Sequence, residues 1–502
     1  MMRIQWAAVC ALLAACDAGS GSSKDDNHSD TSDSSLSPSV GAGVSQDFGQ
    51  FRGILESGAL PGPETIDDVG FFNEHVVSMP EPDCGEDVCL HGLVGSMGNL
   101  ISGSPCTVVT LGMNSPVDPA ELERPPLNLA FVIDTSGSMS GDPIRYVRSG
   151  LTAALSELEP EDRISLVTFG SDAQVLADGL AGDDTRLLTA IDEISARGST
   201  NLYEGLRRGF EALDRHTGEG YQDRVILLSD GESTAGLTDP TRALNLSEAW
   251  ANYGYSLTTI GVGDSFEPEL MRGLAEVGDG AFYFLEDPAA VEEVFIEELS
   301  FFLFPIAEDA RITLELDDGW EAVGVYGTNQ AEWSGQEVVL DIPLLQLAHR
   351  TSASDNDSGR RGGGGAIIVE VMATGAIESG VVGQAGLDYH TPVEGALVSQ
   401  ALSTEVAGEL PWFFNTAAEK SFVMLNLYVG FKLAAERAAV HNYTAAMSVL
   451  VPLRAGVASW LEDNADSDIE DDLYYLDLFI RNLEAFGGGA RVAEGEISWP
   501  QD

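Results

Sequence analysis

Five oxygen-bearing side chains stand at three places in the chain, in turns or at the ends of apolar stretches. They are Asp134, Ser136, Ser138, Thr200 and Asp230. The set combines carboxylates with hydroxyls and contains neither nitrogen nor sulfur. Oxygen ligands of this kind suit a hard divalent ion with octahedral geometry. The residues therefore predict a site for Mg²⁺ or Mn²⁺ rather than Zn²⁺, with Ca²⁺ as a further candidate.

The first three of these residues lie in a turn between a predicted strand and a predicted helix. The run Leu127–Ile133 is apolar and rich in branched residues, which is typical of a strand buried on both faces. The helix opens with Asp142, which can cap it, and Pro143, which fits the first helical position. Its apolar residues repeat at helical spacing: Ile144, Val147, Leu151, Leu155 and Leu158. Sheets built from alternating strands and helices place ligand sites in such turns.

Strands and helices alternate over the whole central part of the chain. The predicted strands are Leu127–Ile133, Ile164–Phe169, Gln174–Leu176, Val225–Ser229, Leu257–Val262 and Ala281–Leu285. The predicted helices are Pro143–Leu158, Arg186–Ile194, Tyr203–Leu213, Thr241–Tyr253, Pro268–Val277 and Pro288–Phe302. This order predicts an α/β fold: a doubly wound, mostly parallel sheet covered on both faces, with β-rich and helical segments beside it.

The span from about residue 127 to 300 resembles a von Willebrand factor type A (VWA) domain. The metal-ion-dependent adhesion site of that family is written D-x-S-x-S, followed later by a Thr and then an Asp. Here the first motif is Asp134 to Ser138, the Thr lies in Gly198-Ser199-Thr200-Asn201, and the Asp lies in Leu228-Ser229-Asp230-Gly231. The alternative is a capping Asp and Ser pair at a helix start, with an unrelated Thr and Asp downstream.

The resemblance implies specific roles for these residues. The hydroxyls of Ser136, Ser138 and Thr200 would bind the ion directly, and Asp134 and Asp230 would often act through water. An ion held mainly by neutral oxygens keeps most of its charge and seeks an Asp or Glu from a partner protein. The family fold also implies one short antiparallel edge strand, here Gln174–Leu176.

Composition limits the classes of partner. The chain has 502 residues, enough for two to four domains, and 44% of them are hydrophobic. Its 81 acidic residues against 25 basic ones give a formal net charge of −56. Such a balance argues against nucleic acid as a partner and against a basic patch that binds anionic lipid.

The N-terminus reads as an export and anchoring signal. Arg3 precedes the short apolar run Trp6–Leu13, and Leu13-Ala14-Ala15-Cys16 resembles the lipobox of bacterial lipoproteins. The alternative is a plain secretory signal. We expect a signal peptide over residues 1–16, lipidation of Cys16 and a disordered Ser/Asp/Gly tether over 17–46. These features predict a protein anchored by lipid to a bacterial membrane, inner or outer, with its folded part in the periplasm or at the cell surface.

Four further regions follow the tether. Residues 47–126 resemble the small region that precedes the VWA domain in one group of bacterial proteins, 127–302 form the VWA domain, 303–400 read as a β-sandwich, and 401–502 read as helical. The first resemblance depends on Phe51-Arg52, Leu55, Gly58, Leu60-Pro61, Ile66-Asp67-Asp68 and Phe71-Phe72. Two acidic stretches, Asp355-Asn356-Asp357 and Glu462–Asp472, are interpreted as solvated loops, with weak Ca²⁺ binding as the alternative.

Three cysteines remain after the signal: Cys84, Cys89 and Cys106. An exported chain permits disulfides, and Cys84 with Cys89 is the favoured pair because a short turn separates them. The alternative pairs one of them with Cys106. A zinc site is disfavoured because no His pair accompanies the three.

No catalytic motif is found. The chain contains no H-E-x-x-H, G-x-S-x-G, P-loop or dinucleotide-binding signature, and no basic cluster near the five residues that would hold phosphate. The sequence therefore predicts a non-enzymatic envelope protein that binds a partner's Asp or Glu through a bound metal ion. Two alternatives stay open: a structural or assembly factor of an envelope complex, and an accessory subunit of an envelope hydrolase. The oligomeric state is not predicted.

Overall fold

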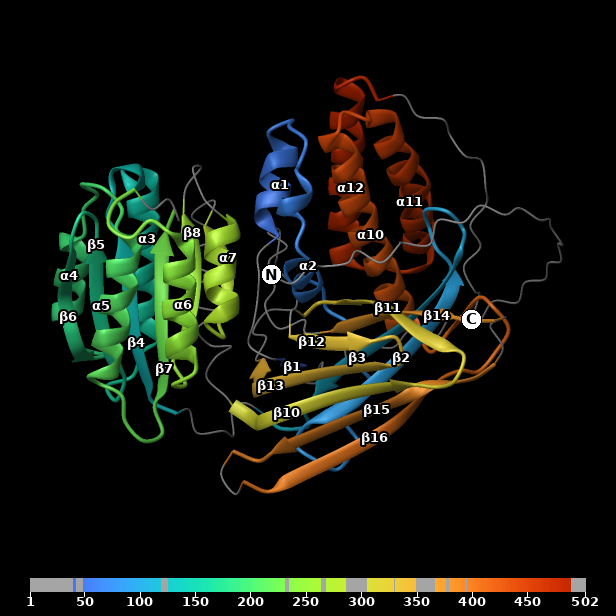
Figure 1. Ribbon diagram of the computed structural model, residues 1–502, viewed down its shortest axis with the longest axis horizontal. Helices are drawn as coiled ribbons and strands as arrows, with labels where there is room; N and C mark the ends of the chain where they lie inside the picture. The colour runs from blue at the N-terminus through green and yellow to red at the C-terminus, as the bar shows by residue number, and fades with distance from the viewer. Residues whose placement is uncertain are drawn as a thin grey trace.

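The computed structural model consists of two lobes joined side by side (Figure 1). The smaller lobe is an α/β domain, and the larger one, called the body here, combines a β-sheet structure with a layer of helices. The predicted lipidation site Cys16, the helix predicted at 288–302 and the loop 351–365 lie outside the described residues. The described ranges are 39–41, 48–118, 125–230, 234–262, 268–285, 305–328, 330–348, 366–375, 379–392 and 395–488.

The α/β domain is built on a sheet with the strand order β6-β5-β4-β7-β8-β9. The strands are β4 Leu127–Asp134, β5 Arg163–Phe169, β6 Ala173–Ala181, β7 Gln222–Ser229, β8 Ser256–Val262 and β9 Phe282–Leu285. Neighbours pair in parallel except β6, which is antiparallel to β5. The predicted fold class is thus confirmed. The edge strand is longer than the predicted Gln174–Leu176, because pairing with β5 carries it past Asp178 and Gly179, where local β propensity is low.

Helices cover both faces of this sheet. They are α3 Asp142–Ala154, α4 Arg186–Glu193, α5 Leu202–Asp214, α6 Pro240–Ala251 and α7 Pro268–Val277. The central strand β4 serves two apolar cores: Phe131 and Ile133 pack with α3 and α4, whereas Ala130 and Val132 pack with α5 and α7. Every residue of β4 is buried, which explains why its sequence is apolar except at Asn128 and Asp134.

The body's strands form one antiparallel system. They are β1 Ser39–Gly41, β2 Cys89–Gly98, β3 Pro105–Asn114, β10 Pro305–Leu316, β11 Trp320–Tyr326, β12 Ala331–Ser334, β13 Glu337–Ala348, β14 Ile367–Ala373, β15 Gly380–His390, β16 Leu397–Val406 and β17 Trp412–Phe413. The order is β11-β14-β3-β1-β13-β10-β15-β16, with β2 also paired to β3, β17 to β2 and β12 to β13. Their inward side chains, among them Trp320 and Tyr389, enclose a continuous apolar core.

The α/β domain is inserted into this strand system between β3 and β10. Strands from both sides of the insertion pair directly, for example Val109 of β3 with Val369 of β14. Regions 47–126 and 303–400, treated separately in the sequence analysis, therefore share one sheet. Residues 39–41, which were assigned to the tether, form β1 instead: Val40 is 1% exposed and pairs with both β3 and β13. Pairing between segments this distant leaves no local periodicity to read.

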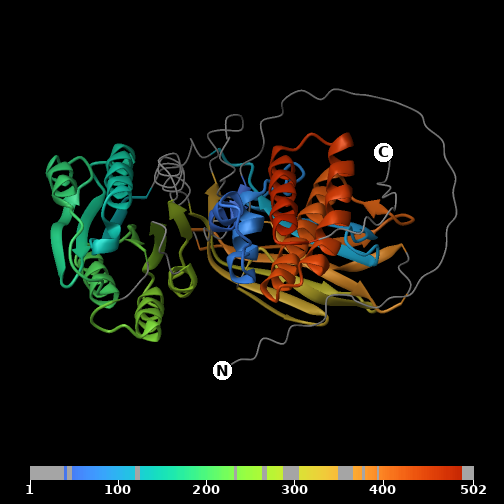
Figure 2. The same cartoon turned by 90° about the horizontal axis from the view of Figure 1, so that it is seen from above.

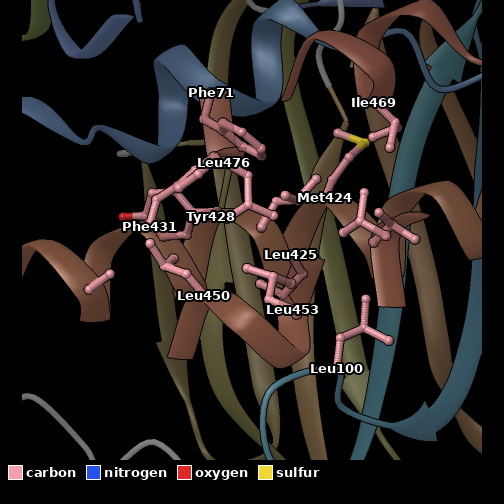
Figure 3. Close-up of a cluster of buried hydrophobic side chains, with 14 of the residues drawn as sticks. Phe71, Leu100, Met424, Leu425, Tyr428, Phe431, Leu450, Leu453, Ile469 and Leu476 are labelled. Carbon is pink, nitrogen blue, oxygen red and sulfur yellow. The ribbon is translucent and has the colours of Figure 1, made fainter. Parts of the chain in front are cut away.

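A helical layer covers one face of the body's strands (Figure 2). It contains α10 Thr416–Ala439, α11 Tyr443–Asp463 and α12 Ser467–Ala485, together with the N-terminal α1 Gly49–Glu56, the short 3₁₀ helix Pro63–Thr65 and α2 Asp68–Glu74. Side chains from α2, α10, α11 and α12 converge in one core, where Phe71, Phe431, Leu450 and Leu476 meet (Figure 3).

Among the described residues, α11 is the helix long and apolar enough to cross a membrane by length and composition alone. In the structure, 44% of its most apolar window is buried. It packs within the helical layer through residues such as Leu450, Leu453 and Trp460. The core therefore accounts for the buried side of this helix.

Candidate functional site

Asp134 is the last residue of the central strand β4, at the carboxyl end of the parallel strands, and is fully buried. Its Oδ1 accepts a hydrogen bond from the backbone N–H of Ser136 at 2.7 Å. Its Oδ2 accepts one from the hydroxyl of Ser229 at 2.6 Å. These two donors fix the orientation of the carboxylate at the start of the turn.

The two serines of the turn lie side by side. The Oγ atoms of Ser136 and Ser138 are 2.9 Å apart. Ser136 is 2% exposed, whereas Ser138 is open to solvent. The pair therefore reaches from the buried carboxylate toward the surface, where a ligand from another molecule could approach.

Thr200 is held in a loop that is bonded to the same turn. The N–H of Gly137 donates to the carbonyl of Gly198 at 3.1 Å, and a second backbone bond links Arg197 to Thr135. Thr200 donates its N–H to the hydroxyl of Thr234 at 2.9 Å. Within the described part of the chain, no hydrogen bond engages the Thr200 hydroxyl. That oxygen remains available as a ligand.

Asp230 follows β7, the strand next to β4, and is 2% exposed. The pKa of Asp134 is raised to about 6 mainly because burial disfavours its charge, and the negative charge of Asp230 adds to the rise. Hydrogen bonds from Ser229 and Ser136 oppose the shift. A divalent cation between the two carboxylates would favour their ionised forms.

These observations fit the predicted ligand chemistry. Among the described residues, no group of three or more His, Cys, Asp and Glu side chains could hold a metal ion. The candidate set is instead a pair of buried carboxylates with three hydroxyl oxygens, which matches a hard ion and not a soft one. Asp134, Ser136 and Ser138 are in direct contact through the bonds above, the Thr200 loop is bonded to their turn, and Asp230 acts on Asp134 through its charge.

Sequence reasoning missed two residues that position the site. Ser229 orients Asp134, and Thr135 anchors the turn by donating its N–H and its hydroxyl to the carbonyl of Phe169, at 2.7 and 2.8 Å. A signal for Ser229 existed, because it ends the strand expected beside β4 in a parallel sheet. Thr135 lies inside the D-x-S-x-S motif, at the position written x.

The remaining sequence predictions concern the body. Cys84 and Cys89 are joined by a disulfide with Cα atoms 5.6 Å apart, and Cys106 is buried with its Sγ 4.0 Å from Glu370 Oε1. The acidic run 462–472 is a solvated loop only in part, because most of it lies at the end of α11 and in the first turns of α12, and three of its acids are paired with bases. Asp466 and Asp468 lie 2.7 and 2.8 Å from Nζ of Lys420, and Asp472 pairs with His75.

Comparison with known proteins identifies the smaller lobe. The family model described as the von Willebrand factor type A domain matches residues 128–297. The chain therefore carries a VWA domain, as its resemblance to that family implied. A domain of this class indicates protein interaction or adhesion, and such domains commonly bind a divalent metal ion.

The relatives match part of the chain rather than all of it. YfbK of Escherichia coli is 30% identical over 201 residues, which are 39% of this chain and 35% of the relative. Protein sll0103 of Synechocystis is 31% identical over 176 residues, 34% of this chain and 40% of the relative. Inter-alpha-trypsin inhibitor heavy chain H1 of Sus scrofa is 35% identical over 158 residues, 30% of this chain and 18% of the relative. The chain thus spans well under half the length of these relatives.

A solved structure shows the same fold over a larger share of the chain. The von Willebrand factor type A protein from Catenulispora acidiphila aligns with a TM-score of 0.50 at 15% identity. The alignment covers 78% of this chain and 96% of that one. This coverage exceeds the VWA domain, so the likeness in fold extends to the body.

Proposed function

We propose that this chain is a cell-envelope lipoprotein that grips a protein partner through a divalent metal ion held at the end of β4. The supporting observation is the turn itself: two hydroxyls 2.9 Å apart lead from the buried carboxylate of Asp134 to the surface. Mg²⁺ or Mn²⁺ is the proposed ion, with Ca²⁺ as a weaker candidate.

The division of ligands explains how such a site would bind a partner. Neutral oxygens would come from Ser136, Ser138 and Thr200. Negative charge would come from the buried side of the site, from Asp134 and Asp230. The bound ion would provide the positive charge that attracts an Asp or Glu of the partner. The chain's own residues hold the hydroxyls in place and exclude water from the side of Asp134, which is fully buried.

Titration calorimetry with Mg²⁺ and Mn²⁺ tests the site. We expect the parent protein to bind the ion and Asp134→Asn to lose binding, while Thr200→Ala binds more weakly than the parent. Asp142→Asn is the matched control, because Asp142 lies near the same turn but is 65% exposed and paired with Arg145. With ion at about 100 times its Kd, the parent should gain about 2.7 kcal/mol of stability that Asp134→Asn does not gain. A parent that binds neither ion would end the proposal.

The mode of partner binding needs a second experiment. Capture of a partner from envelope extract is compared in Mg²⁺ and in EDTA, with the parent and with Thr200→Ala. Loss of capture in EDTA and in the variant supports metal-bridged binding. Capture that survives EDTA would favour a permanent structural or assembly role. Co-purification of a hydrolase would favour the role of an accessory subunit.

Anchoring at Cys16 forms a separate part of the proposal, and its support is the sequence of the N-terminal signal. Cys16→Ser should yield an unprocessed or soluble protein, because the thioether to lipid forms on the cysteine sulfur. Detergent partitioning and the mass of the mature chain measure this. A Ser variant that partitions into detergent with the parent's mass would contradict lipidation. Fractionation of the parent between inner and outer membrane decides which membrane holds it.

A further inference from the structure

The VWA domain meets the body through α7, which lies on the side of the domain facing α1 and α2 (Figure 1). Nε of Arg272 on α7 is 3.5 Å from Oδ2 of Asp67, just before α2. Nη1 of Arg272 donates a hydrogen bond to the backbone carbonyl of Glu64 at 3.5 Å. The side chains of Arg272 and Asp67 are only 13% and 14% exposed. An ion pair therefore crosses from one lobe to the other and is largely shielded from solvent.

The receiving corner of the body is rich in charge. Asp67 caps α2 by accepting the N–H of Gly70 at 2.9 Å. Its neighbour Asp68 accepts the N–H of Gly327 at 3.1 Å, and Lys432 of α10 donates to the carbonyl of Ile66 at 2.7 Å. The pKa of Asp68 is raised to about 7, first by burial and then by the charge of Asp67. The charge of Lys432 opposes this rise, and the guanidinium of Arg272 brings a second cation to the same corner, beside Asp67.

On the VWA side, the guanidinium of Arg272 is also positioned. Its Cζ lies 5.5 Å from the centre of the Phe282 ring on β9, within range of a cation–π contact. The side chain is thus held by its own domain while its charge is presented to the body. Arg272 is therefore oriented by the VWA domain where it contacts Asp67 of the body.

We propose that Arg272 and Asp67 form a latch that sets the orientation of the VWA domain on the body, and that breaking the pair frees the domain to reorient. The domain is an insertion, joined to the body between β3 and β4 and between β9 and β10. Two connections do not by themselves define its orientation, and relative motion of domains is expected unless a large apolar interface prevents it. Here the described contact is polar.

The Arg272–Asp67 pair also affects the orientation of the proposed metal site relative to the N-terminal segment. The site lies on the VWA domain at the end of β4, whereas β1 ties the N-terminal segment to the body through β3 and β13. Release of Arg272 would change how the site is directed relative to that segment. Unlike the proposed function, this inference requires neither metal nor partner.

Small-angle X-ray scattering on the full chain tests the latch. Arg272→Glu should increase the radius of gyration and broaden the distance distribution, because a third carboxylate would face Asp67 and Asp68. Asp67→Asn should shift both in the same direction by less, because Asn keeps the helix cap but removes the charge. Arg215→Glu is the matched control: the same charge change in the same domain, at an exposed pair with Asp178 that does not cross the junction.

A folding control is needed to interpret the scattering results. Circular dichroism melting of each variant shows whether it is folded, and Asp67→Asn decides the matter if Arg272→Glu fails to fold. A changed distribution in folded Asp67→Asn, with Arg215→Glu like the parent, supports the latch. Folded variants of Arg272 and Asp67 that scatter like the parent would refute it. Magnesium titration on the same samples reports on the metal site independently, so failure of one idea is distinguishable from failure of the other.

Discussion

Two groups of buried aspartates, one in each lobe, are held in opposite ways. In the VWA domain, burial and the charge of Asp230 raise the pKa of Asp134 to about 6, and the groups that oppose this rise are neutral hydrogen-bond donors. In the body, burial would likewise raise the pKa of Asp468, but Lys420 and His75 outweigh it and lower the value to about 2. The aspartate ion is therefore stabilised at Asp468, beside Lys420 and His75, and destabilised at Asp134 in the VWA domain.

In this network of the body, Asp466, Asp468 and Asp472 are paired with bases from distant elements. Lys420 on α10 lies 2.8 Å from Asp468 on α12, and Nε2 of His75, which follows α2, lies 2.9 Å from Asp472. Nδ1 of His75 faces the carbonyl of Phe71 at 2.6 Å. Because both of its partners are acceptors, His75 satisfies them together only as an imidazolium. The network therefore closes within the chain, whereas the groups that oppose the raised pKa of Asp134 are neutral hydrogen-bond donors, and its proposed counter-charge is a bound divalent ion.

The largest expected effect comes from opening the body's network. Lys420→Met should lower the free energy of unfolding by about 3–5 kcal/mol, because it leaves the carboxylates of Asp466 and Asp468, only 19% and 9% exposed, without the Lys420 cation. Urea unfolding measures the loss. Arg454→Met is the matched control: it removes an ion pair to Asp477 on neighbouring helices, but both side chains are partly exposed, so a loss of at most about 1 kcal/mol is expected. Equal losses of stability in the two variants would contradict a larger contribution from the Lys420 network than from the partly exposed Arg454–Asp477 pair.

The pH dependence of the free energy of unfolding is the second test of the body's charge network. Burial alone would lower the pKa of His75, but Asp472 and then Asp468 outweigh it and raise the pKa above 6.5. Its stabilisation is thus fully present below that ordinary value and is lost as pH rises through the raised one. For Asp468 the stabilisation is present above its ordinary value of 3.8 and is lost as pH falls toward 2.

His75→Gln isolates the histidine part of this profile. The variant should be less stable than the parent by about 1–3 kcal/mol at pH below the ordinary value of His75, where the parent's histidine is charged in both states. The difference should shrink as pH rises above the raised pKa. Unfolding of both proteins across this range checks it. A difference that stays constant with pH would mean that His75 acts through packing alone.

The smallest effect is expected from a positioning residue of the VWA site. Ser229→Ala removes the hydroxyl that orients Asp134 and should weaken Mg²⁺ binding by about 10-fold, in the lower range for residues that orient metal ligands. Ser229→Thr keeps a hydroxyl on a strand that tolerates branched residues and should bind more like the parent. Calorimetry compares the two. Equal Mg²⁺ affinity of Ser229→Ala and the parent would mean that Asp134 needs no such support.

The fold of the VWA domain could be predicted from the sequence to a greater extent than the fold of the body. The difference lies in how far apart in the sequence the interacting segments are. The VWA fold was predictable because most of its strands are followed closely by a helix, and because a strand buried on both faces, such as Leu127–Asp134, is mostly apolar. The five candidate ligands follow strands or lie in loops whose order is set by that fold. The body was predictable only in the kind of element, because several of its strands, such as β1 and β3, also pair with strands hundreds of residues away.

The sequence by itself therefore determined the α/β lobe, the mostly parallel character of its sheet, and the residues placed at the end of β4. Only the tertiary structure decided which distant segments meet. His75 and Asp472, separated by 397 positions, form a buried pair, and β1 joins strands from both sides of the inserted domain. It also showed that Ser229 orients Asp134 and that Arg272 reaches Asp67. The physical reason is that periodicity and capping act over a few residues, whereas burial of charge and pairing of strand edges are decided by whichever groups the completed fold brings together.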